Sequence, residues 1–236
     1  LGKWGSFQHA GALIESMRTT QKFREDFING NLHREKLKEL LEDEIFKTYL
    51  NLFKNKLNLW GNTTHICVLD GDGNGVSVTT TNGEGSGVVV PKTGIMLNNM
   101  LGEEDLNPKG FFKWPPYVRL PSMMSPTAVF SRGKLQLLLG SAGSNRIRSA
   151  IVQTVLNYIH FKMEVDESVN SPRLHYENSE VFLEPGFPEE TLKEIRRHYK
   201  TTLFRSKNMF FGGVQAVDGK FKGAGDPRRG GYVVRV

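Results

Sequence analysis

The residues from Asn62 to Thr81 decide the fold, and they read NTTHICVL-DGDGNG-VSVTTT. Two runs rich in β-branched residues flank a cluster of Gly, Asp and Asn, a pattern that predicts a β-hairpin with a tight polar turn. The turn brings Thr63 and Thr81 to the same end of the strand pair. His65 lies two residues after Thr63 and, because side chains alternate along a strand, faces the same side. The sequence therefore predicts a group of polar side chains at one end of this hairpin.

The other segments predict an α+β layered fold. Residues 1–60 read as charged amphipathic helices broken near residues 29–31, because apolar residues recur at three- and four-residue steps. After the hairpin, strands and helices follow one another without a regular βαβ alternation. The expected elements are a short strand at 88–90, a loop over 98–116, a hairpin over 127–139 with its turn at 131–134, a helix from 146 to about 158, a short helix over 166–171, a strand at 181–183, a helix over 189–199, and closing strands at 212–217 and 223–224.

The composition of the 236 residues excludes several classes of protein. A content of 38% hydrophobic and 24% charged residues is ordinary for a globular protein. The net charge of +6 is dispersed and accompanies no recognised nucleic-acid motif, so we expect no nucleic-acid binding. No apolar run approaches the ~20 residues that a transmembrane helix requires. The single cysteine, Cys67, excludes an internal disulfide framework and a cysteine-rich metal site, and we expect it to be a buried small hydrophobe. The lack of disulfides is compatible with the cytoplasm but does not fix the compartment.

Three glycine-rich segments share features with ligand-binding motifs. Residues 70–75 match the first half of a calcium loop, but the twelfth position is Thr81 instead of Glu, which favours a plain hairpin turn. Residues 83–87 precede an apolar run and not a helix, so we interpret them as a loop and not a phosphate cradle. Residues 140–145 precede a helix, where adjacent backbone N–H groups stabilise negative charge. An oxyanion hole and a plain strand-to-helix connection explain that last segment equally well.

The hairpin with its Asn62-Thr63-Thr64-His65 start resembles the processing site of the gamma-glutamyltranspeptidase family, a group of N-terminal-nucleophile (Ntn) hydrolases. Further blocks match in the family's order, and they are GIMLNN at 94–99, PSMMSPT at 121–127, GSAGSNRI at 140–147, NSPRLH at 170–175 and DPR at 226–228. The resemblance implies part of a four-layer αββα sandwich. It also implies that residues 1–62 are the helical tail of the larger subunit and residues 63–236 the catalytic small-subunit domain.

The resemblance implies a catalytic mechanism centred on Thr63. Autoproteolysis of the Asn62–Thr63 bond would free the α-amino group of Thr63, whose pKa near 8 suits it to take the proton from its own Oγ. Thr81 falls at the family's second Thr, which hydrogen-bonds the nucleophile. The backbone N–H groups of Gly143 and Ser144 fall at the family's oxyanion donors. For His65 we expect an orienting role, with a core-edge histidine as the alternative.

The substrate-binding positions depart from the family's pattern. Glu103 takes the place of the acid that holds the substrate's α-amino group, but it is longer than the usual Asp. Ser122 matches the first of two consecutive Ser residues that hold the α-carboxylate, whereas Met123 replaces the second. Asn82 is assigned to the family's substrate-binding Asn across a segment two residues shorter than usual. These departures affect the expected specificity for a glutamyl group more than the expected acyl-transfer chemistry.

The resemblance implies transfer or hydrolysis of γ-glutamyl amides such as glutathione, with water or an amino acid or peptide as acceptor. It implies no metal and no organic cofactor. The expected partners are the large-subunit region of the same precursor and, compatible with the sequence, a second copy of the chain. One alternative is an amidase or acylase with a non-glutamyl acyl group. Another is a non-catalytic assembly subunit, because an uncleaved Thr63 has no free amine.

Overall fold

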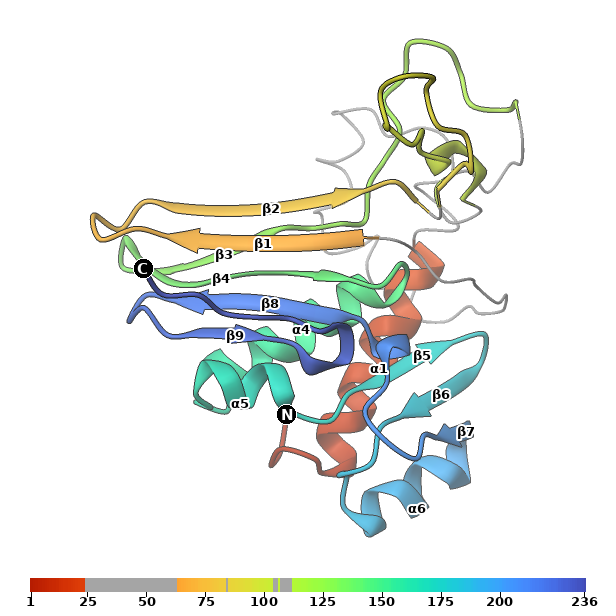
Figure 1. The fold of residues 1–236 in the computed structure, drawn as a ribbon. Coiled ribbons are helices and arrows are strands. Elements are labelled where there is room, and N and C mark those ends of the chain that lie inside the picture. The colour runs from red at the N-terminus through yellow and green to blue at the C-terminus, as the bar shows by residue number, and fades with distance from the viewer. Residues whose placement is uncertain (24–62, 84, 104–105, 107–111) are drawn as a thin grey trace.

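The computed structural model describes residues 1–23, 63–83, 85–103, 106 and 112–236 (Figure 1). The helices in these ranges are α1 (Phe7–Phe23), α4 (Arg146–Ile159), α5 (Val165–Asn170) and α6 (Glu189–His198). The strands are β1 (Thr63–Leu69), β2 (Gly75–Thr81), β3 (Thr127–Ser131), β4 (Lys134–Ala142), β5 (Leu174–Glu177), β6 (Glu180–Leu183), β7 (Lys200–Leu203), β8 (Gly213–Asp218) and β9 (Gly223–Gly225). The helices expected between residues 24 and 60 lie outside the described residues.

The predicted first hairpin is confirmed as β1 and β2. The two strands pair antiparallel, with Thr63 opposite Thr81 at the open end and Leu69 opposite Gly75 at the turn. The Asp70 carboxylate accepts hydrogen bonds from the backbone N–H groups of Asp72 and Asn74, at 3.0 and 2.8 Å. The acid at the start of the turn therefore binds backbone, as in an ordinary Asx turn.

A four-stranded antiparallel sheet in the order β3-β4-β8-β9 forms the centre of the molecule. Side chains alternate along β4, so its two faces pack against different layers. Leu137 and Leu139 belong to one core cluster with Ile147 and Ile151 of α4. On the opposite face, Gly140 lies against the β1–β2 hairpin. The hairpin, the sheet and α4 with α5 thus stack as three successive layers, as predicted for an α+β layered fold (Figure 1).

A second core joins the beginning of the chain to a later segment. Strands β5 and β6 pair antiparallel and β6 and β7 pair parallel, and helices α1 and α6 pack on this small sheet. The buried members of this core are Ala10, Leu13, Ile14, Leu174, Tyr176, Val181, Leu183, Phe187, Leu192 and Ile195. The helix expected at the beginning of residues 1–60 is therefore confirmed as α1, and its apolar face, with Leu13 and Met17, packs against residues that follow the first hairpin.

The structure corrects several sequence-based expectations of secondary structure. It adds β5 and β7, which were not predicted, because each has only four residues and no clear alternation of apolar and polar side chains. The strand expected at 88–90 was wrong, since only an isolated bridge between Val89 and Met96 forms there. The hairpin at 127–139, the helix from 146, the strand at 181–183, the helix from 189 and both closing strands are confirmed within a few residues.

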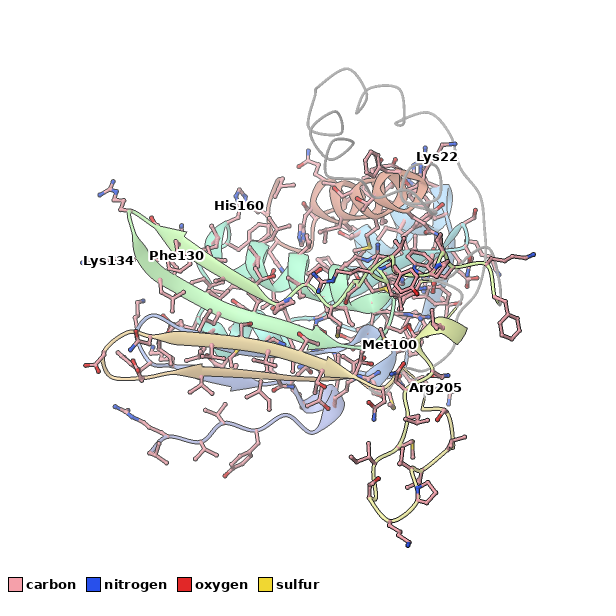
Figure 2. The ribbon with its side chains drawn as sticks, turned by 90° about the horizontal axis from the view of Figure 1, so that it is seen from above. Lys22, Met100, Phe130, Lys134, His160 and Arg205 are labelled. Atoms are coloured by element: carbon pink, nitrogen blue, oxygen red, sulfur yellow. The ribbon has the colours of Figure 1, made fainter. Side chains whose placement is uncertain are left out.

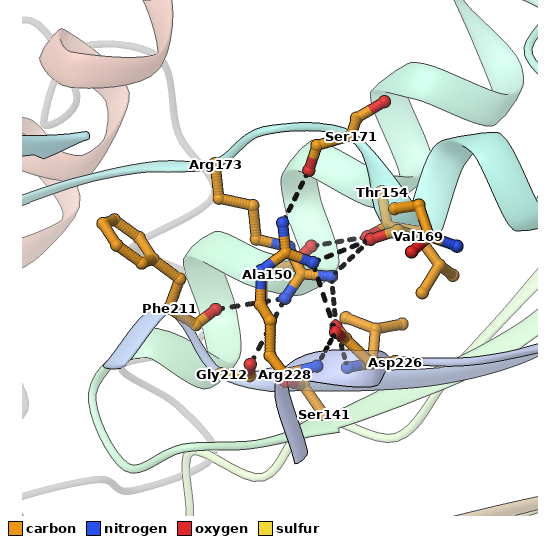
Figure 3. A network of polar contacts seen from close by, with 12 residues as sticks. Ser141, Ala150, Thr154, Val169, Ser171, Arg173, Phe211, Gly212, Asp226 and Arg228 are labelled. Atoms are coloured by element: carbon orange, nitrogen blue, oxygen red, sulfur yellow. Dashed lines mark hydrogen bonds and ion pairs between the residues drawn. The ribbon is translucent and has the colours of Figure 1, made fainter. Parts of the chain in front are cut away.

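A buried ion network ties the C-terminal segment to the middle of the chain (Figure 3). Arg173 pairs with Asp226 at 2.6 Å, and Arg228 binds Glu184 through Nε at 2.7 Å. Arg228 also donates to the Ser171 carbonyl at 2.8 Å. Burial alone would raise the pKa of Asp226, but the charges of Arg173 and Arg228 hold that pKa below its usual value. The two Arg residues therefore stabilise the ionised form of the buried Asp226 carboxyl.

The outer face of the first hairpin is apolar and exposed. Ile66 and Val68 of β1 and Val76 and Val78 of β2 alternate with the inward residues and are each about half exposed. Figure 2 looks down on this layer, with Lys134 at one end of the sheet and Met100 near the other. No helix in the described part of the chain is long and apolar enough to cross a bilayer.

Candidate active site

Thr63 and Thr81 meet at the open end of the first hairpin. The Thr63 hydroxyl donates to Thr81 Oγ1 at 3.0 Å, and the Gly83 backbone N–H donates to the same oxygen at 3.0 Å. Both Thr side chains are half-buried. The ladder pairing of the two residues fixes this contact, because their Cα atoms are direct partners across the strands. The Thr63 hydroxyl is therefore held in one orientation at the start of a strand.

A small pocket beside Thr63 gathers residues from four separate segments. It is lined by five of the predicted site residues, which are Thr63, Thr81, Glu103, Ser122 and Ser144. The other lining residues are Met100, Leu106, Met123, Met124 and Ile147. The cavity volume of about 10 Å³ has room for about one water molecule. Polar side chains thus line this pocket together with apolar ones, which form its apolar wall.

The turn between β4 and α4 contains Gly143 and Ser144. Both have positive φ, +126° and +53°. A Cβ on Gly143 would lie 2.6 Å from Gly212 Cα, so only glycine fits this position. The carbonyls of the two residues accept from the first N–H groups of α4, and their own N–H groups donate to no other described residue. Two backbone donors near a hydroxyl are suited to stabilise a developing oxyanion, although only Ser144 lines the pocket.

His65 does not line the pocket. It lies in a polar seam formed by His65, Cys67, Ser77 and Thr79 between the hairpin and the central sheet. Its side chain is 4% exposed, and its ring nitrogens lie 2.7 Å from Thr79 Oγ1, 3.1 Å from Cys67 Sγ and 3.2 Å from Ser77 Oγ. Burial lowers the pKa of His65 to about 4, so the ring is neutral at pH 7. The structure does not bring this ring into the pocket, and its setting is that of a core-edge histidine.

Cys67 is half-buried and has polar neighbours as well. Its Sγ lies 3.6 Å from the Gln215 carbonyl oxygen and 3.9 Å from Ser77 Oγ. Burial raises the pKa of the Cys67 thiol to about 11. The expectation of a small apolar core residue was therefore wrong about the surroundings of Cys67. The protonated state is unreactive as a nucleophile at pH 7.

The predicted substrate-binding residues have different settings. Glu103 is half-buried, and a Cβ on Gly83 would lie 2.8 Å from Glu103 Oε1. The Ser122 hydroxyl oxygen accepts from the Met124 N–H at 3.2 Å while it lines the pocket. Asn82 is exposed and does not line the pocket. Its carbonyl accepts from the N–H groups of residues 85 and 99, which gives it a role in shaping the loop.

Sequence reasoning did not find the apolar wall of the pocket. Met100, Leu106 and Ile147 carry no polar signal, and each would fit an ordinary core equally well. The sequence shows Met123 only as a replacement for a Ser, with no hydroxyl to donate a hydrogen bond. In the structure Met123 is buried in the pocket wall. The PSMMSPT block around it was the available signal, because it matches the family's order of motifs.

Comparisons with known proteins agree with this geometry. The sequence model of the gamma-glutamyltranspeptidase family matches residues 7–236. The glutathione hydrolase proenzyme of Bacillus subtilis strain 168 is 33% identical over 196 residues, which are 80% of this chain and 33% of that protein. The acylase ACY 1 proenzyme of Pseudomonas sp. strain SE83 is 33% identical over 182 residues, which are 74% of this chain and 32% of that protein. The chain thus spans about a third of the length of these curated relatives.

A solved structure shows the same fold. The gamma-glutamyltranspeptidase from Pseudomonas nitroreducens complexed with L-DON superposes with a TM-score of 0.62 at 27% identity, covering 73% of this chain and 99% of that chain. The predicted Ntn-hydrolase fold class is therefore confirmed. Together with the match over residues 7–236, this likeness shows that the chain belongs to the gamma-glutamyltranspeptidase family.

Proposed function

We propose that this chain is the catalytic portion of a precursor that cuts itself before Thr63 and then transfers or hydrolyses acyl groups. The observation that carries the proposal is the hydrogen bond from Thr63 Oγ1 to Thr81 Oγ1 at the edge of a pocket that Ser144 also lines. The two proposed units are the segment 1–62, as the tail of the larger subunit, and the catalytic segment 63–236.

The proposed maturation and catalysis use one nucleophile. Thr63 Oγ attacks the carbonyl carbon of Asn62, the C–N bond breaks as an ester forms, and water hydrolyses that ester to leave a free α-amine on Thr63. In catalysis this amine takes the Oγ proton while Oγ attacks the substrate amide. The N–H groups of Gly143 and Ser144 hold the resulting oxyanion, and the protonated amine gives its proton to the leaving amine. Water or an acceptor amine then resolves the acyl-enzyme.

The pocket supports specific roles for its polar side chains. Thr81 orients the Thr63 hydroxyl through their hydrogen bond. Glu103 is the acid that lines the described part of the pocket, so it binds an ammonium group on the acyl moiety. The Ser122 hydroxyl donates to a carboxylate on the same moiety. These roles favour a γ-glutamyl donor such as glutathione. A substrate contact by Asn82 and an orienting role of His65 stay predictions.

The exposed apolar face of the hairpin supports a further partner within the precursor. Four large aliphatic side chains, Ile66, Val68, Val76 and Val78, lie side by side on paired strands with water on their outer side. Such contiguous patches mark surfaces that another element covers. The large-subunit region of the same precursor would cover this face and complete the fourth layer of the sandwich. A homo-oligomer stays a prediction.

A second candidate function is an acylase with a non-glutamyl acyl group. Met123 replaces a hydroxyl donor and is buried in the pocket wall, where it lies with Met100, Leu106 and Ile147. This wall would bind an apolar acyl chain better than a second carboxylate contact. A related proenzyme is named an acylase. The two candidates therefore differ in the acyl donor and share the nucleophile.

Intact mass of the full precursor tests the proposal. Wild type should give two polypeptides that meet at Asn62 and Thr63, Thr63→Ala should stay one chain, and Thr63→Ser should still be cut. Thr64→Ala is the matched control, because Thr64 is the exposed neighbour on the outer face and its loss should leave cleavage intact. An uncut wild type would overturn the catalytic proposal and leave an assembly subunit.

The acyl donor is tested on the cut protein with paired chromogenic anilides. A γ-glutamyl anilide should release its amine, and an acceptor dipeptide should speed that release. A preference of tenfold or more for an adipyl or glutaryl anilide, which lacks the α-amino group, would instead assign the acylase function.

A further inference from the structure

A second cavity lies on the other side of the turn that contains Gly143 and Ser144. Its volume is about 140 Å³, enough for several water molecules or a small organic molecule. Helices α1 and α4 and strand β5 form its walls. Ser144 lines the pocket beside Thr63, whereas the next residue, Asn145, lines this cavity. The apolar part of the wall includes Leu13, Met17 and Val152.

The contacts of His175 allow a tautomer to be assigned. The Ser149 hydroxyl donates its one proton to the Arg146 carbonyl at 3.0 Å. With that proton on the Arg146 carbonyl, we assign the 2.9 Å contact between Ser149 Oγ and His175 Nδ1 to a proton on the imidazole. In this assignment His175 carries its proton on Nδ1, and Nε2 is an acceptor. Burial, and then the nearby charges of Arg146 and Arg148, hold the pKa of His175 well below its usual value, so the ring stays neutral.

Two acceptors in this cavity wall have no donor. His175 is only 6% exposed, and its Nε2 forms no hydrogen bond in the described part of the chain. The atom faces Glu177 Oε2, another acceptor, at 3.7 Å. Asn145 Nδ2 donates to Glu177 Oε1 at 2.8 Å, and this bond sets the orientation of the Asn145 side-chain amide. Asn145 Oδ1 is left without a hydrogen-bond partner. A buried polar atom without a partner is destabilising, so a ligand that donates to it gains affinity.

The charges around the cavity decide which kind of donor fits. Arg146 is already paired with Glu177 at 2.9 Å, and Arg148 lines the wall as a further positive charge. Because Glu177 and Arg148 in the wall have opposite charges, a neutral ligand fits this wall better than an ion. A neutral group with two N–H bonds would supply a proton to each unfilled acceptor.

We propose that this cavity is a second binding site, for a small neutral primary amide with a short branched apolar chain. The two amide N–H bonds would be donated to His175 Nε2 and Asn145 Oδ1, and the chain would pack on Leu13, Met17 and Val152. Because Asn145 directly follows Ser144, an occupant of this site contacts the residue next to the proposed oxyanion donors.

Titration of the full precursor with isovaleramide tests the site, with N,N-dimethylisovaleramide as the probe that lacks N–H donors. The ¹⁵N signals of the imidazoles should show His175 with an unprotonated Nε2, and the amide should move that signal with a Kd on the order of 1 mM. The dimethyl amide should bind at least tenfold more weakly. Equal binding of the two probes, no binding at ~50 mM, or a protonated Nε2 in the free protein would each overturn the proposal.

Variants test whether the amide binds inside this cavity and not elsewhere on the protein. Val152 is 47% exposed at the rim, so Val152→Phe should fill the cavity and weaken isovaleramide binding at least tenfold while the protein stays folded. Val234→Phe is the matched control, because Val234 is 73% exposed and does not line the cavity. His175→Leu should lose the preference for the amide over the dimethyl amide. A Val152→Phe protein that binds like wild type would contradict the assignment.

Discussion

The substitution Gly140→Ala should separate the first hairpin from the central sheet. A Cβ at this position would lie 2.1 to 2.6 Å from three atoms of the His65 ring. An ordinary contact begins near 3.4 Å, so the ring would have to move by 3.4 − 2.1 = 1.3 Å. The ring cannot turn aside easily, because Thr79, Cys67 and Ser77 hold both of its nitrogens. We expect the hairpin itself to shift, at a cost of about 1–3 kcal/mol in the free energy of unfolding.

Thermal and urea unfolding measure this cost. For a chain of this length, 1 kcal/mol corresponds to a change of about 2–4 °C in Tm. Gly11→Ala is the matched control, since a Cβ there meets nothing within 4 Å and Ala is the better helix former. Because Thr63 begins the displaced strand, self-cleavage before Thr63 should slow in the Gly140→Ala precursor and not in the control.

A double-variant cycle with His65→Ala identifies the cause. Removal of the ring leaves room for the new Cβ, so Gly140→Ala should cost less than about 0.5 kcal/mol in the His65→Ala background. The reasoning is refuted if Gly140→Ala unfolds at the wild-type midpoint. An equal loss with and without the ring would show that the strain comes from somewhere other than this contact.

Three further predictions concern the ion network, the polar seam and the turn. Arg228→Met should lower the free energy of unfolding by about 3–5 kcal/mol, because Glu184 and Asp226 lose a buried partner; Lys200→Met, at an exposed pair, should cost under 1 kcal/mol in the same urea titration. The pKa of His65 is about 4 in the fold, against 6.5 ordinarily, so only the unfolded chain gains this proton as pH falls from 6.5 to 4. Stability should fall across that window by up to about 3 kcal/mol, and His65→Gln should show a shallower decline in urea titrations at each pH. Gly143→Ala should reduce turnover of the cut protein about 10²-fold or more, and unchanged turnover would remove this turn from the oxyanion hole.

The strongly patterned elements could be predicted from the sequence. Side chains alternate in part along the two strands of residues 62–81, and apolar residues recur about every four positions over 146–158. The first segment forms the expected hairpin and the second the expected helix. Strands β5 and β7 could not be predicted, since LHYE and KTTL contain no apolar run, whereas the equally short β6 was predicted from its apolar residues 181–183. Packing against α1 and α6 stabilises this small sheet. Local pattern is informative where the residues of an element themselves show a period or an apolar run.

The candidate site was predicted in its polar half. The hairpin pattern alone brought Thr63 and Thr81 together, whereas only the matching order of motifs indicated that Ser144 lies beside them. The His65 side chain lies on the predicted face of β1. That face packs on β4, where Gly140 leaves space for the ring. Strand alternation predicts a direction and not the neighbour found there. The layer underneath could not be derived from the hairpin alone.

Helix α1 precedes Thr63 in the chain and packs in the core of the residues that follow it. Ala10 and Ile14 are fully buried with Leu174, Val181 and Leu183. A cut before Thr63 would therefore not release the first segment, because the two polypeptides would keep one core in common. Their joint stability would then obey mass action, so the unfolding midpoint of the cut protein should rise with protein concentration. The midpoint of the uncut Thr63→Ala chain should not change with dilution.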